Sequence, residues 1–191
     1  ADFAWEFGPL GLYDLINDYA NCDWGHYNAI SNGGGQVNQW RTPFHGEWDY
    51  LFNTRQASTL NGVDNARYVK ATVNDVAGAL LFPDAYTHPS GVPVPEHINN
   101  PAIAFSINKY QGANWLSMEN VGAVFLPLAG FRYGCSVYAE GLDGIYWTAE
   151  CYDMSNAWVL RIKDGIYNYN SISDRRRGHS VRLVQDFKPT Q

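Results

Sequence analysis

The apolar segments of this chain are short, and proline or glycine interrupts them before any becomes long. Residues 76–82 form one apolar run that stops at Pro83, and residues 121–126 form another that stops at Pro127. Runs of this length bounded by proline are typical of buried strands. Between them, residues 84–101 are rich in proline and show little periodicity, which predicts a long irregular segment.

Two further segments favour short helices. Thr42 and Pro43 are a good helix start, because threonine caps a helix and proline suits its first position. The apolar residues that follow are spaced to share one helical face: Phe44, Trp48, Leu51 and Phe52. Residues 113–120 are expected to form the second short helix.

After Gly130 the apolar patches become brief and are separated by Gly, Asn, Ser and Asp. Tyr146 and Trp147 mark the start of one strand, and residues 157–162 alternate as a second strand should. If Trp158, Leu160 and Ile162 face the core, then Val159 and Arg161 point outward. Residues 180–184 predict a last strand, and residues 164–179 a polar loop between the two.

Composition and charge limit the classes of function. A length of 191 residues suits one domain, and a net charge of −6 gives no case for nucleic-acid binding. The charge is uneven, because residues 161–182 hold six basic and two acidic residues, a local charge of +4. No apolar run is long enough to cross a membrane. The three cysteines are too few for a disulfide scaffold.

Several segments in combination resemble one known family. They are Tyr27–Gly34, Trp40-Arg41-Thr42, Glu47-Trp48, Gly122–Gly130, Tyr146-Trp147 and Gly178–Val184. Together they look like the Fibrobacter succinogenes major paralogous domain, which is similar in fold to the formylglycine-generating-enzyme branch of the C-type lectin fold. The resemblance covers residues 23–187. It implies one α+β domain of C-type lectin-like fold over residues 1–191, with short strands, about two helices and much irregular loop; residues 1–22 have no recognisable counterpart.

Many members of this family are variable proteins of diversity-generating retroelements. Error-prone copying in those systems alters adenines, chiefly at Asn-type codons, and cannot produce Lys, Glu, Gln, Met or Trp by that route. None of these five residue types occurs from Asp164 to Val184, whereas Tyr, Asn, Ser, Asp and Arg are crowded there. Ordinary loops also use Asn, Ser and Asp. The resemblance implies that residues 130–184 are a diversified ligand-binding region.

The candidate binding residues match the positions that vary in the family. Tyrosine among Ser, Asn and Arg is also the composition of an antibody paratope, in which rigid aromatic anchors lie beside adaptable polar groups. The alternative is a solvated loop with some core tyrosines. Arg175 is assigned to the scaffold, because relatives keep an Arg there. The candidates are Tyr133, Tyr138, Ala139, Ile145, Tyr152, Ser155, Asn156, Val159, Arg161, Tyr167, Asn168, Tyr169, Asn170, Ser171, Ile172, Ser173, Asp174, Arg176, Arg177 and His179.

We expect no catalysis, cofactor or metal site. The five histidines are not at metal-ligand spacing, and neither a nucleophile elbow nor a phosphate-binding glycine loop is present. The alternative is an enzyme of the formylglycine-generating type, which would require Cys135 and Cys151. The family resemblance and the local charge predict a protein or glycan partner, acidic in character, on a cell or phage-host surface. The corresponding location is extracellular, on a cell surface or on a phage virion.

Overall fold

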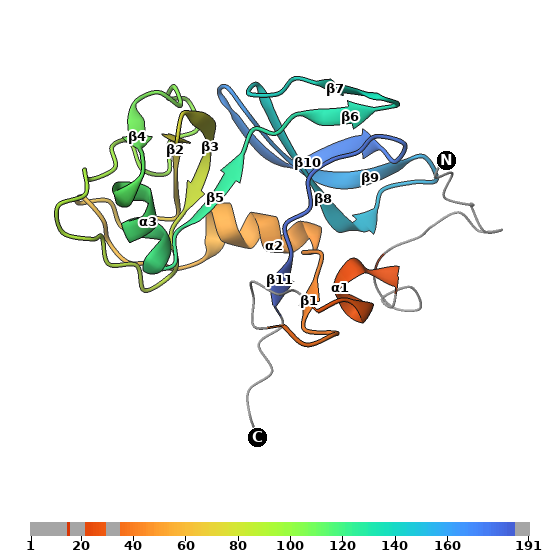
Figure 1. Ribbon diagram of the computed structural model, residues 1–191, viewed down its shortest axis with the longest axis horizontal. Helices are drawn as coiled ribbons and strands as arrows, with labels where there is room; N and C mark the ends of the chain where they lie inside the picture. Colours follow the sequence, from red (N-terminus) through yellow and green to blue (C-terminus); the bar gives the residue numbers. More distant parts are fainter. Residues whose placement is uncertain (1–14, 16–21, 30–34, 186–191) are drawn as a thin grey trace.

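The computed structural model describes residues 15, 22–29 and 35–185, and it shows a mixed α+β chain made mostly of strands (Figure 1). The N-terminal segment that the sequence analysis set apart, residues 1–22, lies outside the described residues except for residues 15 and 22. The helices are short: α1 (Trp24–Tyr27), α2 (His45–Asp49), which continues as the π-helix η3 (Tyr50–Thr54), and α3 (Ala113–Asn120). No helix in the described ranges is long and apolar enough to span a membrane. The predicted helix over residues 113–120 is confirmed.

A four-stranded sheet forms one half of the fold, in the order β4-β2-β3-β5. Its strands are β2 (Tyr68–Val73), β3 (Val76–Leu81), β4 (Asn108–Tyr110) and β5 (Val124–Pro127). The apolar run at 76–82 is a strand, as predicted, and the run at 121–126 is a strand only from Val124, because Val121 and Gly122 form an exposed turn after α3. No helix or strand occurs in the irregular segment between β3 and β4. Strand β2 escaped prediction because Lys70 interrupts its apolar pattern. That lysine is nevertheless buried, with its ammonium bonded to the Pro101 carbonyl at 3.0 Å.

A three-stranded antiparallel sheet forms the other half, in the order β10-β9-β8. Its strands are β8 (Asp143–Cys151), β9 (Asn156–Lys163) and β10 (Ile166–Asp174). Two small pairs complete the fold, one made of β6 (Phe131–Tyr133) with β7 (Ser136–Tyr138), the other of β1 (Trp40–Arg41) with β11 (Val184–Gln185). Figure 1 shows the β6–β7 hairpin lying over the three-stranded sheet.

Helix α2 and η3 join the two sheets, and lie between them in Figure 1. Trp48 and Phe52 project from these helical segments into a core that both sheets share. Tyr68 and Leu126 enter this core from the four-stranded sheet, while Leu160 enters it from the three-stranded sheet. Burial of large aromatic and aliphatic side chains on both sides of one helix therefore links the halves into a single unit.

The start of α2 differs from the sequence prediction. Thr42 does not cap it, because the Asp23 carboxylate accepts hydrogen bonds from the Thr42 amide at 2.6 Å and hydroxyl at 3.1 Å. The N-cap is Phe44, and the Glu47 carboxylate accepts its backbone N–H at 2.7 Å. The same carboxylate pairs with Arg41. Thr42 is thus held by the distant Asp23, and the helix is capped two residues later, where Glu47 accepts the Phe44 N–H.

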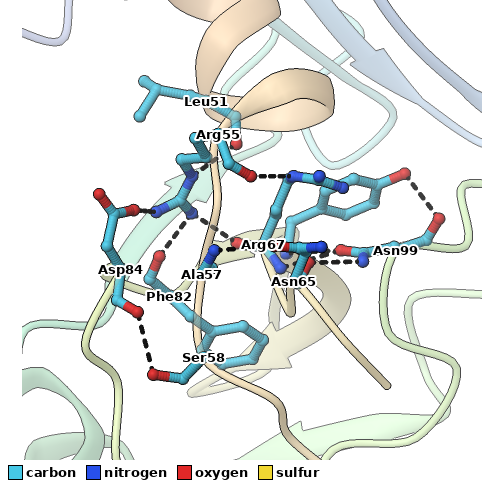
Figure 2. A network of polar contacts seen from close by, with 10 residues as sticks. Leu51, Arg55, Ala57, Ser58, Asn65, Arg67, Phe82, Asp84 and Asn99 are labelled. Carbon is cyan, nitrogen blue, oxygen red and sulfur yellow. Dashed lines mark hydrogen bonds and ion pairs between the residues drawn. The ribbon is translucent and has the colours of Figure 1, made fainter.

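A buried arginine anchors the end of η3 to the four-stranded sheet (Figure 2). The Arg55 guanidinium donates to the carbonyls of Leu51, Arg67 and Phe82 and to the Asp84 carboxylate. These acceptors come from η3, from the segment before β2 and from the segment after β3. The planar guanidinium can reach all of them at once because its donors point in fixed, divergent directions.

Two predictions for the C-terminal third are wrong. Residues 164–179 are not a loop, because residues 166–174 form strand β10 along the edge of the three-stranded sheet. Residues 180–184 are not a continuous strand, because only Ser180 pairs, through an isolated bridge with Tyr146, before β11 begins at Val184. The polar composition of β10 hid a strand whose pairing comes from backbone hydrogen bonds with β9.

Candidate functional site

Both faces of the three-stranded sheet are covered near the middle of β9, and this decides which predicted residues there reach solvent. Leu160 and Ile162 are buried as expected, but Trp158, also expected in the core, is only partly buried, and Val159 is only 1% exposed. Val159 lies on the central strand, paired in register with Trp147 of β8 and Ser171 of β10. The His179 ring lies on this side, 4.4 Å from the Trp147 ring. The prediction that Val159 points into solvent is therefore wrong, because it assumed that one face of the strand is open.

Three other candidates lie inside the fold. Ile145 and Ser173 are buried, and Ser173 bonds to the imidazole of His179 at 2.8 Å. The ring of Tyr167 packs between Phe52 and Tyr68, at centroid distances of 5.1 and 4.6 Å. Burial raises the pKa of the Tyr167 hydroxyl well above its usual value. These side chains contribute to the core, which corresponds to the alternative interpretation of the tyrosines.

Several polar candidates are engaged by neighbours within the chain. The Arg161 guanidinium donates to both carboxylate oxygens of Asp143, with its Nε at 3.0 and 3.1 Å. The Asn156 amide binds Asp153, and the Asp174 carboxylate accepts from Arg176, whose hydrogen bonds hold the pKa of Asp174 at about 2. Arg176 is exposed, but its charge is largely offset by Asp174.

The β6–β7 hairpin and the turn after β10 border an open surface hollow of about 220 Å³, lined by Phe131, Tyr133, Tyr138 and Arg177. The Phe131 and Tyr138 rings are stacked, with centroids 5.6 Å apart and planes 23° apart. The Arg177 guanidinium lies 5.0 Å from the centre of the Phe131 ring, a cation–π distance. We call the hollow lined by these four residues the aromatic hollow. It brings together three predicted residues from two separate segments.

Phe131 is the member of the hollow that sequence reasoning missed. It stands two residues before Tyr133 in strand β6, so both side chains project to the same side of the hairpin. That spacing was a usable signal, but Phe131 alone would have been assigned to the core.

Backbone contacts fix the hollow in place. Arg132 and Gly178 exchange two backbone hydrogen bonds, at 2.7 and 2.8 Å, which attach the hairpin to the segment that carries Arg177. The Arg177 amide closes a turn onto the Asp174 carbonyl at 3.1 Å. At the base of the hairpin, Gly130 has a φ of +70°, and a Cβ there would meet the Tyr138 carbonyl at 2.2 Å. Only glycine fits that position.

The remaining exposed candidates lie on the edge strand β10 and in the loop between β8 and β9, and we call them the rim. Asn168, Asn170 and Ile172 project from β10, and Tyr152 and Ser155 from the loop between β8 and β9. The Asn170 side chain bonds to the His45 imidazole at 2.6 Å, so His45 joins the rim although sequence reasoning did not include it. The partly buried candidates are Ala139, Asn156, Arg161, Tyr167, Tyr169, Ser171, Asp174 and His179.

No group of three His, Cys, Asp or Glu side chains within the described residues could hold a metal ion. Burial, together with the nearby Arg177 guanidinium, lowers the pKa of the His179 imidazole to about 4. Cys135 lies exposed at the tip of the β6–β7 hairpin, while Cys151 ends strand β8. The arrangement in the aromatic hollow offers stacking faces, phenol hydroxyls and one guanidinium, which are groups suited to binding.

Comparison with protein-family models, with curated proteins and with solved structures finds no match to this chain. The family resemblance of the sequence segments stays a hypothesis.

Proposed function

We propose that this chain is a ligand-binding protein rather than an enzyme, and that its ligand contacts the aromatic hollow and extends to the exposed residues of the rim on β10. The observation that carries the proposal is the hollow itself. Tyr133 and Tyr138 are 51% and 47% exposed, and they flank an arginine that no carboxylate of the described chain pairs with. Exposed Tyr and Arg are the residue types that dominate binding energy at recognition surfaces, because they bury much area at little entropic cost.

We further propose that the scaffold is a C-type lectin-like domain and that its binding face is diversified by a retroelement. The mixed α+β architecture and its long irregular segment support the first part. Support for the second comes from the candidate binding residues that face solvent on and after β10, which are Asn168, Asn170, Ile172, Arg176 and Arg177. All are types that adenine-directed changes of an Asn-type codon can reach. The ligand would then be carried on a cell or phage-host surface and differ between variants of the protein.

The genetic part is tested at the gene locus. We expect a neighbouring reverse transcriptase gene and an imperfect repeat of the 3′ coding region. A locus with neither feature would contradict diversification, but it would leave ligand binding by the hollow untouched.

Binding is tested by screening the purified chain against bacterial surface extracts and a glycan array, followed by three sets of substitutions. The hollow set replaces Tyr133, Tyr138 and Arg177 by Ala, and the rim set replaces Asn168, Asn170 and Ile172 by Ala. A matched control set replaces Lys109, Leu116 and Glu119 by Ala; these residues are exposed on β4 and α3.

We expect the hollow set to lose at least tenfold in affinity, the rim set to lose less, and the control set to match the wild type. Thermal unfolding verifies that each variant is folded. Because the hollow adds a positive charge, affinity for an acidic ligand should also fall with added salt. Equal affinity in all three sets would place the binding site elsewhere and contradict the proposal.

A further inference from the structure

Three consecutive arginines follow β10, but they differ in what engages them. Arg176 is bound in bidentate fashion by Asp174, with its Nε at 3.0 and 3.1 Å from the carboxylate oxygens. The Arg175 amide is bonded to the Ser155 carbonyl at 2.9 Å. Arg177 contacts the Phe131 ring, and no carboxylate in the described part of the chain pairs with its guanidinium. Asp174 lies near enough for its charge to act on Arg177, but its carboxylate is bonded to Arg176, so the Arg177 guanidinium remains available to a ligand.

The walls of the hollow offer both aromatic faces and hydroxyl groups to a ligand. Stacked Phe131 and Tyr138 present aromatic faces, and the hydroxyls of Tyr133 and Tyr138 bond to no residue in the described ranges. The volume of about 220 Å³ is below the ~300 Å³ at which pockets for drug-sized ligands begin, so one ring is the fitting size.

These features select among single-ring anions. A carboxylate matches the planar guanidinium of Arg177, which can donate two parallel hydrogen bonds. A pyranose ring offers an apolar C–H face for the aromatic walls and hydroxyls for the two phenols. An aromatic acid would match the walls and the charge but would leave both phenol hydroxyls unused.

We propose that the aromatic hollow binds one uronic-acid unit of a glycan, with its carboxylate on Arg177 and its ring against Tyr138. This inference rests on the proposed binding function and names the chemical class of its ligand. Arg177 is the residue that would set the preference for acidic over neutral sugars.

The experiment is a heteronuclear NMR titration of the whole chain with methyl β-D-glucuronide, methyl β-D-glucoside and benzoate. We expect the glucuronide to bind with a Kd of about 1 mM, since one ring makes few contacts. Binding of the glucoside and of benzoate should be at least tenfold weaker. Shifted resonances should belong to the hairpin and to residues 174–179.

Matched variants separate the roles of charge and stacking. Arg177→Gln should weaken glucuronide binding at least tenfold, whereas Arg132→Gln, on the opposite face of the same hairpin, should change it less than twofold. Tyr138→Leu should also weaken binding, with exposed Tyr50→Leu as its control. Equal affinity for glucuronide and glucoside, preference for benzoate, or no titration at all would each overturn the inference.

These outcomes stay distinct from those of the proposed function. If a partner from the surface screen loses affinity in the hollow set but glucuronide does not titrate, then the hollow binds another class of ligand. If glucuronide titrates but no surface partner is captured, then the sugar site stands and the cell-surface function fails.

Discussion

The phenol ring of Tyr167 meets the ring of Tyr68 edge to face, with centroids 4.6 Å apart. This contact joins β10, the edge of one sheet, to β2 in the other sheet across the shared core. Tyr167 is therefore a structural residue within a segment whose composition suggested recognition, and its neighbour Asn168 on the same strand faces solvent.

Two substitutions of Tyr167 should distinguish the contribution of its ring packing to stability from that of its hydroxyl group. Tyr167→Ala should lower the free energy of unfolding by roughly 3–5 kcal/mol, as for other large-to-small aromatic changes in a core. Tyr167→Phe should raise it by about 1 kcal/mol, because the buried hydroxyl has no hydrogen-bond partner within the described residues. Urea unfolding measures both, and Asn168→Ala should stay within about 0.5 kcal/mol of the wild type. A loss from Tyr167→Phe would mean that the hydroxyl is bonded.

The Arg161–Asp143 pair should behave as a partly buried ion pair. Arg161→Ala leaves the buried Asp143 carboxylate without its partner, and we expect a loss of about 2 kcal/mol. That is below the ~3–5 kcal/mol of a fully buried pair, because the Arg161 side chain is 40% exposed. Arg161→Ala combined with Asp143→Asn should cost less than the sum of the single changes. A double-mutant cycle by chemical unfolding gives the coupling energy, and a value near zero would contradict a role for the pair.

Even a charge-conserving substitution of Arg55 should destabilise the protein. Arg55→Lys keeps the charge but cannot donate to three carbonyls and a carboxylate in different directions, so we expect a loss of at least ~2 kcal/mol. Arg132→Lys is the matched control, since exposed Arg132 donates through its side chain to the Gly134 carbonyl alone. Thermal unfolding of both variants tests this, and similar shifts would show that the Arg55 network contributes little.

His179 should make stability depend on pH. Its folded-state pKa of about 4 lies below the usual value of 6.5, so the folded chain favours the neutral ring. As pH falls from about 6.5 towards 4, the unfolded chain takes up a proton that the folded chain does not, and stability drops. His179→Gln should flatten this part of the dependence of the unfolding temperature on pH. His97→Asn, at an exposed position, should follow the wild type; an unchanged slope in His179→Gln would contradict the assignment.

Part of this architecture could be read from local sequence. The strands at 76–82 and 121–126, the helix at 113–120 and the strand at 157–162 were predicted, because apolar runs, proline stops and alternation act over a few residues. The exposure of Tyr133, Tyr138 and Arg177 agreed with expectation for a similar reason: short strands and turns rich in Gly and polar residues lie at the surface.

Contacts between distant segments decided the rest. Strand β10 is polar, and only its pairing with β9 makes it a strand. Val159 was expected outside because alternation assigns one face to solvent, but residues 178–180 and the hairpin cover that face. Likewise, whether Arg176 or Arg177 is available depends on which of them Asp174 engages. The sequence by itself determined that short strands lie near residues 76–82, 121–126 and 157–162 and a helix at 113–120, since apolar runs and proline stops depend on neighbours along the chain. Which side chains meet in the hollow was decided only by the tertiary structure, because covering a sheet on both faces changes the burial of residues that have the same local pattern.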